Sequence, residues 1–133
     1  MRIAIVLDEG LPPGLAANAS AALALSLTSR IGDVIGPAVV DADGSPHAGI
    51  LTVPIPVLRC PASELGGLRE KALRTGGVGT LDFSSLAQAA RDYGDYSARL
   101  AAAGAAAIVY RGLCFYGEDA AVRGLTGSLP LYR

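Results

Sequence analysis

The only histidine of the chain, His47, is the side chain best suited to acid–base chemistry. It follows Pro46 in a proline- and glycine-rich segment, and an unperturbed imidazole titrates near neutral pH. His47 is therefore a candidate general acid or base, or a contact to a bound molecule. A hydrogen-bonded histidine on a surface loop is the more ordinary interpretation, and the sequence leaves both open.

Two further polar residues lie where ligands commonly bind. Asp8 ends the first apolar run, Ile3 to Leu7, and open α/β sheets place ligand contacts at such strand ends. A solvated turn is the alternative. Asn18 lies near the start of an apolar helical segment, where free backbone N–H groups favour polar ligands. Its alternative is a capping or side-chain-to-backbone hydrogen bond.

Thiol, metal and nucleotide chemistry lack their usual patterns. Cys60 and Cys114 form no C-x-x-C pair, and a catalytic thiol needs a neighbouring base that the sequence does not supply. The segment 41–44, Asp-Ala-Asp-Gly, superficially resembles a calcium loop but lacks the remaining ligands, so we expect a turn and no metal. No glycine-rich phosphate loop is present, so we expect no cofactor.

The elements that must position these residues alternate between strand and helix, which predicts an α/β fold: a mixed sheet of about four main strands with helices on both faces. A long hairpin with its turn near Asp43-Gly44 interrupts the alternation between residues 36 and 61. The expected strands span residues 3–7, 53–59, 78–83 and 108–116. The expected helices span residues 15–30, 61–74, 84–100, with an interruption and restart at Gly94-Asp95, and 118–125.

Length and composition limit the classes of function. The chain has 133 residues, which suits a single domain over residues 1–133. Its formal net charge of −1 argues against nucleic acid as a partner. Its longest apolar stretch, Leu15 to Leu27, is broken by polar residues and is too short for a membrane span. We therefore expect no membrane association and a cytoplasmic location, which two isolated cysteines also suit.

Several motifs are similar to those of a family of small uncharacterised proteins that share the type II peptidyl-tRNA hydrolase-like fold. The opening strand is followed by Leu-Pro-x-Gly-x-x-Ala-Asn-Ala at 11–19, which resembles the strand–loop–helix opening of those hydrolases. The ending, Leu-Thr-Gly-Ser-Leu-Pro-Leu at 125–131, resembles their C-terminal tail. Between them lie His-x-Gly at 47–49 and Pro-Ile-Pro at 54–56.

The resemblance implies that fold, a homodimer, and a cleft where the first helix meets the C-terminal tail. It predicts that Asn18, Tyr116 and Thr126 lie together at one end of the sheet, in ligand-binding positions. The hairpin is long enough to bring His47 to the edge of the same cleft.

The departures from the hydrolases concern the reaction. The hydrolases carry lysines before the first helix, where this chain has Pro-Pro-Gly-Leu, and their acidic residue before the final helix has no clear equivalent. We therefore predict that the chain binds a small molecule or a protein partner in the cleft beside the first helix, and does not hydrolyse peptidyl-tRNA at a useful rate. The alternative is an ester hydrolase acting on peptidyl-tRNA or a smaller acyl ester, with His47 or Asp8 replacing the lost groups.

Overall fold

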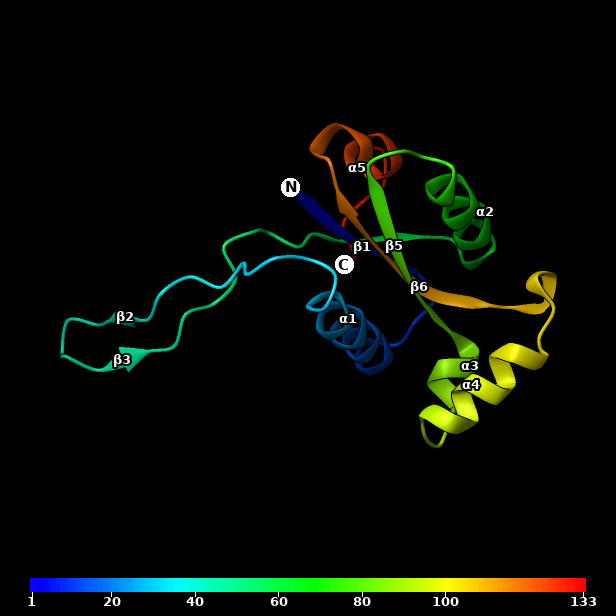
Figure 1. Ribbon diagram of the computed structural model, residues 1–133, viewed down its shortest axis with the longest axis horizontal. Coiled ribbons are helices and arrows are strands. Elements are labelled where there is room, and N and C mark those ends of the chain that lie inside the picture. The colour runs from blue at the N-terminus through cyan, green and yellow to red at the C-terminus, as the bar shows by residue number, and fades with distance from the viewer.

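The central strand of the fold is β1 (Arg2–Asp8), whose apolar residues are buried on both of its faces. A computed structural model describes residues 1–133 and places β1 in a four-stranded mixed sheet of order β4-β1-β6-β5 (Figure 1). Strand β4 (Val57–Cys60) runs parallel to β1, whereas β6 (Tyr110–Gly117) and β5 (Val78–Ser84) complete antiparallel pairs.

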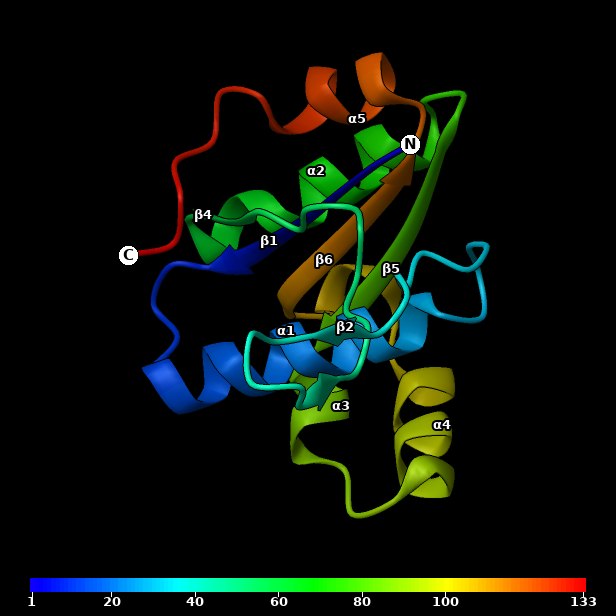
Figure 2. The same ribbon diagram turned by 90° about the vertical axis from the view of Figure 1, so that its left-hand side faces the viewer.

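Helices cover both faces of this sheet (Figure 2). Helix α1 (Pro13–Leu27) packs on the face that carries Ile3, Ile5 and Leu7. Helices α2 (Ala62–Leu73) and α5 (Asp119–Thr126) pack on the other face, around Phe115. Short helices α3 (Ser85–Ala89), α4 (Tyr93–Ala102) and η1 (Ala105–Ala107) connect β5 to β6. The expected α/β class, four-stranded mixed sheet and two helical layers are confirmed.

Local chemistry explains where the helices begin. The Ser84 hydroxyl accepts a hydrogen bond from the Ala87 amide and caps α3. The Asp92 carboxylate accepts from the Asp95 amide at 2.8 Å and caps α4. Two caps in succession divide residues 84–100 into two helices, and the second begins at Tyr93, one residue before the expected restart at Gly94-Asp95. No helix is long and apolar enough to pass through a lipid bilayer.

The hairpin is present, but it points away from the sheet. Its strands β2 (Val39–Val40) and β3 (Pro46–His47) pair only with each other. Figure 1 shows it extending to the left of the other elements. We call residues 33–53 the arm and the rest of the chain the body.

The C-terminal tail covers the outer edge of β4. The Arg59 amide donates to the Pro130 carbonyl at 3.0 Å, and the Tyr132 amide donates to the Val57 carbonyl at 2.9 Å. The tail thus acts as a short extra edge strand. It leaves β5 as the unpaired edge of the sheet.

Candidate functional site

Helix α1 crosses its face of the sheet and leaves a hollow on each flank. The hollow toward β4 is small and apolar, about 300 Å³, and lies between the start of α1 and Tyr132. The hollow toward β5 is a groove of about 510 Å³, a volume typical of small-molecule sites. Because the larger groove also carries polar and charged side chains, it is the better candidate site.

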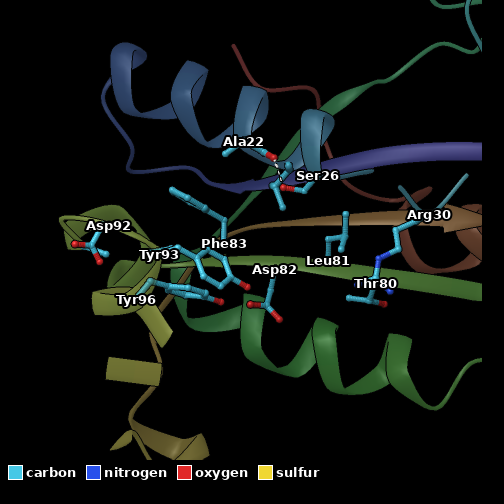
Figure 3. A pocket seen from close by; sticks show the side chains of 13 residues that line it. Ala22, Ser26, Arg30, Thr80, Leu81, Asp82, Phe83, Asp92, Tyr93 and Tyr96 are labelled. Carbon is cyan, nitrogen blue, oxygen red and sulfur yellow. Dashed lines mark hydrogen bonds between the residues drawn. The ribbon is translucent and has the colours of Figure 1, made fainter. Parts of the chain in front are cut away.

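Three elements form this groove (Figure 3). The C-terminal half of α1 and the turn after it form one wall, β5 forms the floor, and α3 with α4 forms the other wall. Figure 3 shows Phe83, Tyr93 and Tyr96 at one end, Arg30 and Thr80 at the other, and Asp82 between them. The lining residues are Ala22, Leu23, Ser26, Arg30, Thr80, Leu81, Asp82, Phe83, Ala87, Ala90, Asp92, Tyr93 and Tyr96.

The aromatic end presents ring surface to solvent. The rings of Tyr93 and Tyr96 meet edge to face with centroids 5.5 Å apart, and Tyr93 is 81% exposed. Burial, followed by the charge of Asp82, raises the pKa of the Tyr96 phenol, so this hydroxyl stays protonated over a wide pH range. Exposed, rigid aromatic rings of this kind suit stacking against a flat ligand.

The two acidic side chains of the groove are already engaged. Asp82 accepts a hydrogen bond from Nε of Arg69 at 3.0 Å, and that guanidinium lies 5.3 Å from the centroid of the Tyr110 ring. Asp92 is the cap of α4. The side chain of Arg30, by contrast, makes no hydrogen bond or ion pair. Arg30 is therefore the one cation that lines the groove, and it has no partner in the protein.

A hydroxyl close to Arg30 is also unpaired. The Oγ1 atom of Thr80 is buried and has no hydrogen-bond partner. A buried polar atom without a partner is costly. Thr80 pairs with Phe115, however, so its hydroxyl lies on the side of β5 that faces α2 and not on the side that faces α1. The groove thus offers a flat apolar surface at one end and a cation at the other. Its lining contains no histidine or cysteine, the side chains that would supply a base or a strong nucleophile.

Asp8 lies outside this groove, at the C-terminal end of β1, and is almost fully buried. Its Oδ1 accepts from the Gly10 amide at 2.8 Å, and its Oδ2 pairs with Arg111 at 3.3 Å. The next residue, Glu9, pairs with Arg59 at 3.3 Å. These contacts fix the turn after β1, so Asp8 is not part of a solvated turn, and its charge is balanced within the protein.

The structure does not bring Asn18 and Thr126 together, so the expected cleft is wrong in its geometry. Asn18 lies on the exposed side of α1, and its side chain makes no hydrogen bond. Thr126 lies at the end of α5, across the sheet, where its buried hydroxyl donates to the Val122 carbonyl at 2.8 Å. The sheet separates the two side chains because α1 and α5 cover opposite faces.

The tail nevertheless reaches the start of α1, as the resemblance implies. The residue that makes this contact is Tyr132, whose hydroxyl donates to the Leu11 carbonyl. Tyr116 lies at the opposite end of β1 from Asp8, since it pairs with Ile3. Its ring lies across Gly79, where an added Cβ would come within 2.2 Å of the ring.

His47 lies on the arm, and its Nε2 is 2.8 Å from Oδ2 of Asp41. Asp41 also accepts from the Asp43 and Ser45 amides, and Gly44 takes a positive φ of 85°, so segment 41–44 is the expected turn. Hydrogen bonding to His47, then to the turn amides, lowers the pKa of the Asp41 carboxyl. The expectation that His47 reaches the edge of a cleft is wrong, because the arm points away from the body.

Sequence reasoning missed the residues that form the groove. Tyr93 and Tyr96 are three residues apart, a spacing that places two side chains on one side of a helix and could have drawn attention to them. Arg30 and Thr80 gave no such signal. They are fifty residues apart in the sequence and meet only because α1 lies over β5.

The comparisons with known proteins identify a family and a fold. The model of a family described as "Protein of unknown function (DUF2000)" matches residues 1–133. No curated protein matches the chain. A solved structure of a protein of unknown function from Agrobacterium tumefaciens strain C58 is similar, with 17% sequence identity and a TM-score of 0.87. The match covers 99% of this chain and 97% of the other, and at this identity it bears on the fold alone.

Proposed function

The chain belongs to the DUF2000 family of proteins of unknown function, and we propose that it is a binding protein for a small planar acid. The ligand class is a flat ring that carries one carboxylate or phosphate. The observation that carries the proposal is the groove itself, with aromatic rings at one end and the unpaired Arg30 at the other.

Each part of such a ligand has a matching part of the groove. A flat ring would lie against Tyr93 and Tyr96, where aromatic contacts contribute about 0.5–1.5 kcal/mol beyond burial. The acid group would reach Arg30, whose guanidinium can donate two parallel hydrogen bonds. The groove therefore favours a molecule with one apolar and one anionic end.

Binding is favoured over ester hydrolysis, the alternative. Hydrolysis through a nucleophile needs a base within hydrogen-bond reach, and His47 lies on the arm away from the groove. Asp8 is held by Gly10 and Arg111. The net charge of −1 also disfavours the several phosphate contacts that a tRNA requires. The proposal accordingly includes no peptidyl-tRNA hydrolysis and no nucleic-acid partner.

We further infer that the fold is the type II peptidyl-tRNA hydrolase-like fold and that the protein works in the cytoplasm. The contact between the tail and the start of α1 supports the fold name. The two cysteines are free and buried, which suits a reducing compartment. Direct ligand contacts by Asp8, Asn18, His47, Tyr116 and Thr126 stay predictions, and all five residues lie outside the groove lining.

The test compares two probes of equal shape, 1-naphthoate and 1-naphthamide, by calorimetry at low salt. We expect naphthoate to bind about five- to tenfold more tightly than naphthamide, since one partly exposed ion pair contributes on the order of 1 kcal/mol. Arg30→Met should abolish this preference. Tyr96→Leu should weaken both probes to a similar extent, because it removes ring surface that both use.

Arg91→Met is the matched control, since Arg91 lies next to the groove with its side chain 84% exposed and does not line it. This variant should keep the preference for naphthoate. Failure of both probes to bind, or an unchanged preference in Arg30→Met, would contradict the proposal. Turnover of labelled peptidyl-tRNA within about tenfold of a genuine hydrolase would instead support the ester hydrolase.

A further inference from the structure

The arm exposes apolar side chains that no part of its own body covers. Ile50 is 75% exposed, and Val39 and Val40 are each more than 60% exposed. Ile35 and Leu51, which pair across the base of the arm, are exposed as well. A patch of this kind marks a surface that meets another molecule.

The arm is nevertheless built as an ordered ribbon. Gly36 donates its amide to the Ile50 carbonyl at 2.9 Å, and Thr52 donates to the Val34 carbonyl at 2.7 Å. At Gly49 the two sides of the arm approach so closely that an added Cβ would lie 1.7 Å from the Gly36 carbonyl oxygen. A two-stranded ribbon alone in water is only marginally stable, so packing against a further surface would stabilise the arm.

A second uncovered apolar surface lies on α1, on the same side of the molecule (Figure 2). No residue from Pro13 to Leu27 is charged, although only one side of the helix packs on the sheet. Leu25 is 75% exposed and Leu15 is 42% exposed on the outer side. The outer side also carries the polar Asn18 and Ser26, but its two leucines leave apolar surface that a partner can cover.

We propose that the arm of one molecule lies across the outer side of α1 in a second copy of the chain, and that the second arm returns the contact. Both halves of the interface, the arm and α1, are on every chain. A twofold axis therefore satisfies both at once, as in an isologous dimer. This inference does not rest on the proposed ligand.

Charge and size favour a second copy as the partner. Residues 31–58 contain three aspartates and no lysine or arginine, so the arm region carries −3 and the remainder of the chain carries +2. An acidic arm is thus attracted to the basic body of another copy. The arm and four turns of helix supply about the 20–30 residues a side found in a standard interface.

The first experiment measures mass by sedimentation between about 1 and 100 µM. We expect the wild-type chain to sediment at twice its 13.4 kDa. The arm variant Val40→Asp/Ile50→Asp and the helix variant Leu25→Asp should each raise the dimer dissociation constant at least 100-fold while keeping the wild-type circular dichroism. The control Leu73→Asp/Val109→Asp changes two exposed apolar residues outside both surfaces and should remain dimeric.

The second experiment tests which surfaces meet. Ile50→Cys and Leu25→Cys proteins are mixed and oxidised; the two native cysteines are buried and do not interfere. We expect a cross-linked dimer of one chain of each kind. A monomeric wild type at 100 µM, a dimer that survives the arm variant, or cross-linking of Ile50→Cys to itself alone would each overturn the proposal.

Discussion

Two buried thiols lie on opposite faces of the sheet, Cys60 toward α2 and Cys114 toward α1. Burial raises the pKa of Cys114 from 9.0 to about 12. Burial, helped by the charges of Glu64, Glu9 and Asp8, raises the pKa of Cys60 to about 11. Neither thiol is therefore a nucleophile at neutral pH, in agreement with their structural interpretation.

This placement predicts a loss of stability in alkali. As the pH rises above 9, the unfolded chain releases the thiol protons while the folded chain keeps them, so the free energy of unfolding falls until the folded pKa values are reached. Each thiol adds a slope of at most about 1.4 kcal/mol per pH unit. Denaturant titrations from pH 8 to 10.5 should give a shallower slope for Cys114→Ala than for wild type. Equal slopes would contradict the burial of Cys114.

The residue types alone indicated which side chains could be functional, but the tertiary structure determines what each of them contacts. Asp8 was expected at a strand end and is there, but its pairing with Arg111 depends on a residue 103 positions away. His47 was expected in the hairpin and is there, yet no local pattern says that the arm points outward. Which side chains come together depends on tertiary packing, and the local sequence around each residue does not specify it.

At the scale of the elements, α1 can pack closely on the sheet because Gly112 on β6 has no side chain. A Cβ added at Gly112 on β6 would lie 2.8 Å from Leu7 and 3.1 Å from Leu23, between the strand and the helix. We expect Gly112→Ala to lower the free energy of unfolding by about 1–3 kcal/mol through overpacking. Chemical denaturation measures this change in the free energy of unfolding.

Gly67→Ala is the matched control, because an added Cβ in the middle of α2 meets nothing within 4 Å. Helix propensity alone should make this variant more stable by about 0.5–1 kcal/mol. If both variants are destabilised equally, the close approach of α1 to Gly112 is not real.

The alternation of strands and helices was predictable because each element has its own periodicity and caps. Helix α2 was expected over 61–74 and spans Ala62–Leu73, and the chain turns soon after it at Gly76-Gly77, where Gly77 takes a positive φ of 79°. The order of strands in the sheet was not predictable in this way. The placement of α1 beside β5, which makes the groove, follows from that order.

For the whole molecule, the C-terminal tail protects an edge of the sheet. Removal of residues 129–133 would free the backbone groups of β4 that now pair with Pro130 and Tyr132. An exposed strand edge recruits other chains, so we expect this truncation to aggregate at concentrations where wild type stays clear, as measured by light scattering.

The variant Tyr132→Phe distinguishes the effect of the covered strand edge from the effect of the Tyr132 hydroxyl. It keeps the tail and removes only the hydrogen bond to Leu11, at a cost of about 1 kcal/mol. This variant should scatter no more light than wild type. If Tyr132→Phe aggregates as much as the truncated chain, then the hydroxyl, and not the covered edge, prevents aggregation.

The order of the strands in the sheet also affects how the chain folds during translation. The ribosome makes β1 first, yet β1 is the central strand, and its antiparallel neighbour β6 is the last strand to emerge. Until then Ile3, Ile5 and Leu7 have only α1 and β4 to shield them, so the nascent chain carries its most apolar strand half-covered for most of its translation. The sheet is therefore complete only after β6 has emerged, and a chaperone would matter most in the interval before that point.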